Sequence, residues 1–93
     1  METQTYVIML RPANKFGGPK TEEIVSQHFE YLKNLLEKGI LTLAGRFSEV
    51  LIGLAMIQTK TKDEAMAIMK NDPAIKAGIF HGELYPWRIA LQA

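Results

Sequence analysis

The order of strand-like and helix-like segments constrains the fold of this chain more than any other feature. Apolar residues at three- and four-residue spacing predict one helix after Thr21 and a second over residues 62–71. Runs rich in β-branched and aromatic residues predict strands at residues 6–10, 41–47, 51–58 and 80–89. The resulting β-α-β-β-α-β order predicts an α+β protein, a ferredoxin-like sandwich with both helices on one face of an antiparallel sheet.

Local signals mark the ends of the helices. Thr21 is expected to be the N-cap of the first helix and Gly39 its C-terminal stop, while Thr61 and Glu64 form a capping box at the second. Pro73 then breaks the chain before an expected extra turn over residues 74–77. The first helix should bury one stripe of residues: Ile24, Val25, His28, Phe29, Leu32, Leu35 and Leu36.

The length of 93 residues predicts a single domain over residues 1–93, too small for a deep enclosed pocket. The last strand alternates between two kinds of side chain. Phe80 and Leu84 suit the helices, whereas the other set is polar and aromatic: His81, Glu83, Tyr85 and Trp87. With 47% hydrophobic residues in the chain, we expect a second copy to pack on this helix-free face and form a homodimer.

Composition excludes several classes of partner. The 11 basic and 10 acidic residues form no block of like charge, which argues against nucleic acid and anionic lipid. No cysteine is present, which suits a reducing compartment. The longest apolar run, residues 50–57, is too short to span a membrane, and the first residues lack a secretory signal. We therefore expect a cytoplasmic protein with no membrane partner and no cofactor.

Chain direction places several polar residues at one end of the predicted fold: Arg11, His28, Arg46, Asp72 and His81. Each also has an ordinary structural interpretation. An aspartate before proline, as in "NDPAIKAG", is most often a turn residue, and a lone histidine on an apolar helix face is more often a core residue. Arg46 could simply flank a strand and His81 could be solvated. Two histidines without a third suitable ligand argue against a metal site.

Several stretches together resemble the YCII-related proteins over nearly the whole chain. The first strand carries Tyr6-Val7-Ile8, and residues 28–45 read "HFEYLKNLLEKGILTLAG". The second helix carries "TKDEAMAIMKNDP", and the chain continues as "NDPAIKAGIFHGELYPWRI". The resemblance implies a dimeric α/β barrel, in which two sheets pack face to face and a cleft contains His28.

The resemblance also implies a site chemistry. Members of the family have been proposed to use a His-Asp pair, which corresponds here to His28 and Asp72, and one relative is a dehydrochlorinase acting on a chlorinated aromatic ring. Where the family often has Ala-Gly-Pro, this chain has Ala44-Gly45-Arg46. The added cation favours an anionic ligand.

These observations predict a small homodimeric enzyme of lyase or isomerase type that acts on a small polar or aromatic molecule. His28 would be the acid/base group and Asp72 its partner. Arg46, Arg11 and His81 would bind the substrate. The alternative is a non-catalytic dimeric module that binds a small ligand in the same cleft or serves as an accessory protein.

Overall fold

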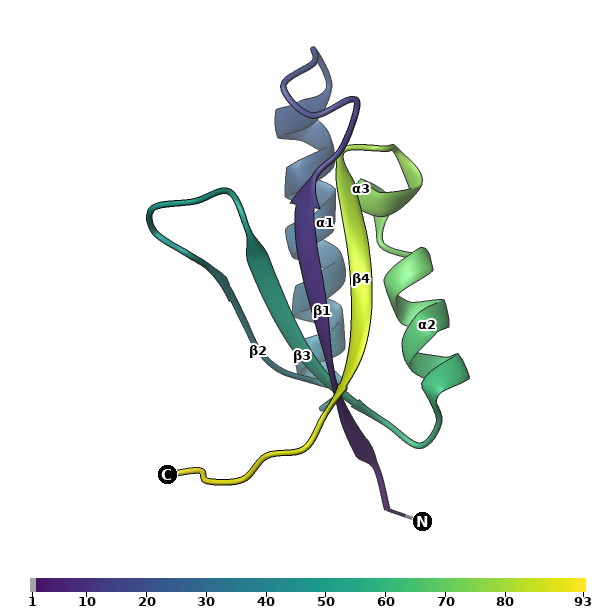
Figure 1. The fold of residues 1–93 in the computed structure, drawn as a ribbon. Helices are drawn as coiled ribbons and strands as arrows, with labels where there is room; N and C mark the ends of the chain where they lie inside the picture. Colours follow the sequence, from purple (N-terminus) through teal and green to yellow (C-terminus); the bar gives the residue numbers. More distant parts are fainter. Residues whose placement is uncertain (1) are drawn as a thin grey trace.

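The computed structural model describes residues 2–93 and shows a four-stranded antiparallel sheet with its helices on one face (Figure 1). Its elements are β1 (Gln4–Pro12), α1 (Thr21–Glu37), β2 (Leu41–Arg46), β3 (Gly53–Thr59), α2 (Lys62–Lys70), α3 (Pro73–Lys76) and β4 (Phe80–Trp87). The strand order is β2-β3-β1-β4. This arrangement confirms the predicted ferredoxin-like α+β fold.

The strand register assigns residues to the two faces of the sheet, because directly opposite residues share a face. On the helix-covered face, Tyr6, Ile8 and Leu10 of β1 are buried together with Ala55 and Ile57 of β3. Phe80 and Leu84 of β4 pack against the same core, as predicted. The helix-free face carries an apolar row that crosses all four strands, formed by Leu43, Met56, Val7 and Tyr85.

The start of α1 differs from the prediction. Thr21 is the first helical residue and not the N-cap; Lys20 occupies the N-cap position and makes no side-chain capping bond. The Thr21 hydroxyl instead accepts a hydrogen bond from the backbone N–H of Gly17 at 2.9 Å. Thr21 therefore holds the preceding loop against the helix, a role that depends on the path of that loop.

The end of α1 agrees with the prediction. Gly39 has φ 77°, a conformation that glycine adopts without steric cost. Its N–H donates to the carbonyl of Leu36 at 3.0 Å, and the N–H of Ile40 donates to Leu35 at 2.9 Å. This pair of bonds is the Schellman motif, which satisfies carbonyls at the helix end and turns the chain into β2.

The predicted apolar stripe of α1 is wider than the face the helix buries. His28, Leu32 and Leu35 are buried, whereas Phe29 and Leu36 are 58% and 53% exposed. The helix therefore contacts the sheet along a narrower line and leaves apolar side chains at its flank.

The second helix begins as predicted. The Thr61 hydroxyl accepts a hydrogen bond from the N–H of Glu64 at 3.1 Å and caps α2. The helix ends at Lys70, one residue before the predicted end, and the expected extra turn is the short helix α3.

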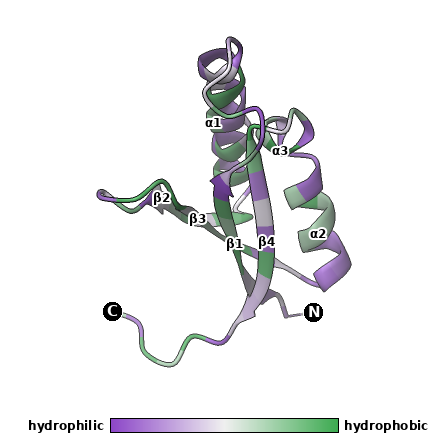
Figure 2. Cartoon of the chain, turned by 45° about the horizontal axis from the view of Figure 1, so that its top comes forward, coloured by the Kyte–Doolittle hydropathy of each residue, from purple (hydrophilic) through white to green (hydrophobic). Residues whose placement is uncertain are grey.

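The strand ends also differ from their predicted positions. β3 begins at Gly53 and not at residue 51, and β4 ends at Trp87 and not at residue 89. Pro86 lies in β4, an edge strand, where proline is tolerated because no further strand among residues 2–93 pairs with the outer side of β4. The β2–β3 connection projects from the sheet and carries half-exposed apolar residues: Phe47, Val50 and Leu51 (Figures 1 and 2).

A glycine in β4 seats the segment between α2 and α3 close to the sheet. A Cβ on Gly82 would lie 2.6 Å from Cδ1 of Ile75 and 2.9 Å from Sδ of Met69. Both distances are shorter than van der Waals contact, so Ile75 and Met69 can pack this closely on β4 only because residue 82 has no side chain. The junction that contains Asp72 is thereby packed directly on the core.

Candidate functional site

His28 and Asp72 form a buried pair between α1 and the N-cap of α3. Nδ1 of His28 lies 2.6 Å from Oδ2 of Asp72, and each residue is only 4% exposed. The other carboxylate oxygen, Oδ1, accepts a hydrogen bond from the N–H of Ala74 at 2.8 Å. Asp72 is therefore both the turn residue of "NDPAIKAG" and the partner of His28.

The local sequence explains how one carboxylate fills both roles. Pro73 stands at the first helical position of α3, where its fixed φ favours a helix start and its missing N–H costs nothing. Asp72 then caps α3 through one oxygen. The second oxygen remains directed at α1, because a carboxylate can accept bonds at both oxygens.

The bond to Asp72 determines which tautomer of His28 is expected. An ionised carboxylate can only accept hydrogen bonds, so Nδ1 must be the donor to Asp72. The neutral ring then keeps its lone pair on Nε2. Within residues 2–93, every side-chain nitrogen or oxygen that is fully buried has a hydrogen-bond partner. Nε2 of His28 has no hydrogen-bond partner in this part of the chain, so it cannot be one of the fully buried atoms. Nε2 is therefore in reach of solvent.

Aromatic rings surround the histidine. Phe80 meets the ring of His28 edge-on, with centroids 5.3 Å apart and planes at 80°. The ring of Phe29 lies 5.4 Å away, and Phe16 stacks on Phe80 at 6.0 Å. These contacts fix the plane of the imidazole and provide apolar surface beside it.

Tyr31 adds a contact that the sequence interpretation did not include. Its hydroxyl donates a hydrogen bond to the backbone carbonyl of Ile68 at 2.7 Å. Burial raises the pKa of Tyr31, and the charge of Asp72 raises it further, so the hydroxyl stays protonated. The position three residues after His28 on one helix face is the signal that could have identified it.

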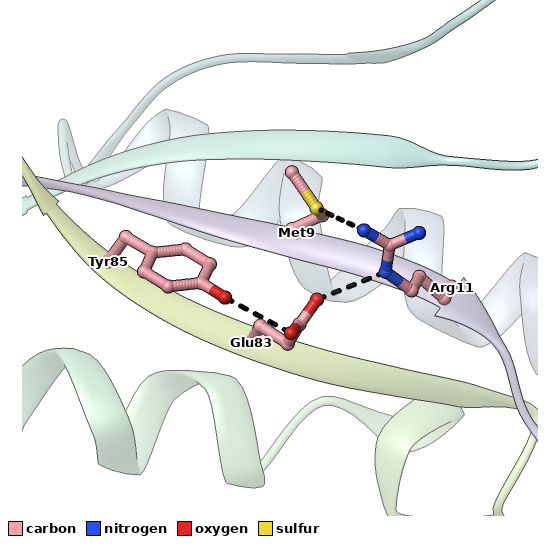
Figure 3. A network of polar contacts seen from close by, with 4 residues as sticks. All are labelled: Met9, Arg11, Glu83 and Tyr85. Atoms are coloured by element: carbon pink, nitrogen blue, oxygen red, sulfur yellow. Dashed lines mark hydrogen bonds and ion pairs between the residues drawn. The ribbon is translucent and has the colours of Figure 1, made fainter.

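Arg11 and Glu83 belong to a polar network on the helix-free face (Figure 3). Nε of Arg11 donates to Oε1 of Glu83 at 3.0 Å, and Nη2 donates to Sδ of Met9 at 3.1 Å. The Tyr85 hydroxyl donates to Oε2 of Glu83 at 3.1 Å. The bond from Arg11 lowers the pKa of Glu83, and the bond to Glu83 raises the pKa of Tyr85.

The sheet separates the polar residues that were predicted to share one end of the molecule. Arg11 is paired with His81 in register, and both lie on the opposite face from His28. Arg46 is paired with Gly53 of β3, which is paired in turn with Leu10 of β1. Because Leu10 faces the helices, Arg46 lies on the helix-covered face. The structure thus joins His28 to Asp72, gives Arg46 the same face, and puts Arg11 and His81 across the sheet. The substrate-binding role of these three stays a prediction.

Two hollows differ greatly in size. A narrow cavity of about 10 Å³ beside Tyr31 and Asp72 has room for roughly one water molecule. An open hollow of about 430 Å³ lies where β1 ends and β4 begins, lined by Pro12, Ala13, Asn14, Lys15, Gly78 and His81. His28 lines neither of them. Neither of these two hollows therefore encloses a substrate site at His28.

Within residues 2–93 no group of three histidine, cysteine, aspartate or glutamate side chains could hold a metal ion. None of the described helices combines the length and the apolar character needed to cross a membrane.

Comparison with known proteins gives a family match and a solved structure of similar fold. The sequence profile of the YCII-related domain matches residues 5–88. No curated protein matches the chain. Among solved structures, the chain is similar to 5-chloro-2-hydroxyhydroquinone dehydrochlorinase from Burkholderia phenoliruptrix AC1100, in complex with 2,5-dihydroxybenzoquinone. The two share 18% sequence identity and a TM-score of 0.62, over 89% of this chain and 93% of the other.

Proposed function

This chain belongs to the YCII-related domain family, and we propose that it is a small enzyme in which His28 moves a proton on a bound small molecule. One observation carries this proposal: the buried carboxylate of Asp72 holds Nδ1 of His28 at 2.6 Å. The bond orients the ring and leaves Nε2 as the nitrogen that can meet a substrate.

The proposed chemistry is proton abstraction and return, as in a lyase or an isomerase. Nε2 of His28 takes a proton from the substrate, and the negative charge of Asp72 stabilises the imidazolium that forms. The same nitrogen then returns the proton to another atom of the substrate or to its leaving group. Imidazole suits both steps because it exchanges protons near neutral pH.

The proposed substrate is a compact polar or aromatic molecule. The similar dehydrochlorinase acts on a chlorinated hydroxyhydroquinone, and the rings of Phe80 and Phe29 beside His28 suit an aromatic ring. Arg46, on the same face, is proposed to hold an anionic group. Arg11 and His81, which are paired across β1 and β4, are proposed to bind the substrate beside the open hollow that His81 lines.

A homodimer is expected to form through the helix-free face. The apolar row of Leu43, Met56, Val7 and Tyr85 crosses this face, and Tyr85 and Leu43 are about half exposed. Sedimentation at micromolar concentration should give twice the chain mass of 10.5 kDa. A Met56→Lys change should produce monomers, because it puts a charge in the row.

The matched control for the dimer is Phe29→Lys, which makes the same kind of change at an exposed position on α1. This variant should remain dimeric. A parent protein that sediments as a stable monomer would contradict the interface, and so would equal effects of the two variants.

The function itself is tested by mapping ligands onto the protein. A panel of hydroxylated aromatics and aromatic carboxylates, including 2,5-dihydroxybenzoquinone, is titrated while the imidazole signals are followed by NMR. The proposal predicts that a binding compound shifts the Nε2 signal of His28 and that a turnover assay detects proton exchange or loss of a leaving group. Binding without any turnover across the panel would favour a ligand-binding module.

A further inference from the structure

The end of α2 contains a backbone carbonyl that the helix leaves without its usual donor. In a continuing helix the N–H of Asp72 would bond the carbonyl of Ile68. It donates instead to the carbonyl of Met69 at 3.2 Å. Carbonyls in the last turn of a helix need partners from elsewhere. The hydroxyl of Tyr31, on α1, donates to Ile68 at 2.7 Å and supplies that partner.

This bond and the His28–Asp72 bond form a pair of links between the same two segments. His28 and Tyr31 are three residues apart, so they lie on one face of α1. Their partners, Ile68 and Asp72, are four residues apart at the junction of α2 and α3. One bond would fix the distance between the segments, whereas two bonds one turn apart also fix their relative rotation.

Asp72 itself is fixed within α3 and moves with it. Its Oδ1 accepts from Ala74, and its backbone carbonyl accepts from Ile75 and Lys76 at 3.0 Å each. None of these local bonds reaches α1. The direction from Oδ2 of Asp72 to the imidazole of His28 therefore depends on contacts between the helices. Among the polar contacts that α1 makes with this segment, the Tyr31–Ile68 bond lies next to the His28–Asp72 bond, three residues further along α1.

We propose that Tyr31 is a positioning residue, which holds the α2–α3 junction so that the carboxylate of Asp72 stays in line with Nδ1 of His28. The inference rests on the proposed function only for its catalytic consequence, since the alignment can be measured without a substrate. The chemistry of the phenol suits the role, because burial and the nearby carboxylate keep its proton in place.

The test compares Tyr31→Phe with Tyr85→Phe. Both changes remove one hydroxyl, and Tyr85 lies on the helix-free face, where its hydroxyl bonds Glu83. The measured quantity is the rate at which the Nδ1 proton of His28 exchanges with water, followed by NMR. The backbone amide of Ile57 serves as the reference, because this residue is fully buried and its exchange reports opening of the whole domain.

In Tyr31→Phe the Nδ1 proton is expected to exchange about 10-fold faster relative to the Ile57 amide, and in Tyr85→Phe this ratio should stay the same. If Tyr31→Phe accelerates both protons equally, the tyrosine only stabilises the fold and the proposal is overturned. An unchanged ratio, or an equal change in Tyr85→Phe, overturns it as well. Should Tyr31→Phe be poorly folded, the same ratios are measured in sucrose, which favours the compact state.

These outcomes are separate from those that test the proposed function. If His28 proved unnecessary for turnover, the exchange ratio would still report whether Tyr31 aligns the pair. If the ratio were unchanged, His28 and Asp72 could still act as the acid/base pair, and only the role of Tyr31 would be lost.

Discussion

A His28→Gln variant is expected to fold and bind ligand but to lose turnover by about 100-fold or more on a compound that the parent converts. Glutamine has roughly the size and polarity of histidine, and its amide can still donate to Asp72. It cannot take up and return a proton at neutral pH. The measurement is kcat on that compound, together with the dissociation constant from NMR titration.

The control for this variant is Lys33→Gln, an exposed change on the same helix, which should leave kcat and binding as in the parent. Unchanged turnover in His28→Gln would favour the ligand-binding module over the enzyme. Loss of folding in His28→Gln would indicate that the histidine serves only the core.

An Asp72→Ala variant is expected to lose about 1.5 to 5 kcal/mol of unfolding free energy. The loss combines a helix cap, worth about 0.5 to 2 kcal/mol, with about 1 to 3 kcal/mol for a buried Nδ1–H left without an acceptor. Chemical denaturation measures the change. The control is Asp63→Ala, an exposed acid in the first turn of α2, which should lose no more than about 1 kcal/mol. Equal losses in the two variants would contradict the double role of Asp72.

Asp72→Asn separates the structural role from the electrostatic one. The amide oxygen can keep the bond from Ala74, while the amide nitrogen faces Nδ1 of His28 as a donor. Stability should therefore remain near that of the parent, but the neutral ring must now carry its proton on Nε2. In a Ser-His-Asp triad the equivalent change lowers kcat by about 10⁴-fold through the wrong tautomer.

Periodicity and capping signals were sufficient to predict the element order and most helix ends. The capped start of α2 and the stop at Gly39 depend on bonds within a few residues, so the sequence carries them directly. The start of α1 was predicted wrongly because Thr21 bonds the N–H of Gly17 in a loop whose path depends on tertiary contacts. The extent of the β2–β3 connection likewise does not follow from residue preferences alone.

The site was predicted only in part because chain direction gives the end of the molecule but not the face. Alternation along the strands supplies the face: Arg11 follows the buried Leu10, and His81 follows Phe80, so both point away from the helices. Chain direction and strand alternation, used together, would have placed Arg11 and His81 on the face opposite to His28. The hydrogen-bond distance between His28 and Asp72 requires the packing of α3 on the sheet, which no local pattern encodes.

The position of the proton on the His28 ring tests most directly whether Asp72 prepares Nε2 for proton transfer. The chain has two histidines, so a ¹⁵N–¹H spectrum of the imidazoles is assigned with a single His81→Gln variant. We expect the neutral ring of His28 to carry its proton on Nδ1 in the parent and on Nε2 in Asp72→Asn. A proton on Nε2 in the parent, or the same tautomer in both proteins, would contradict this expectation.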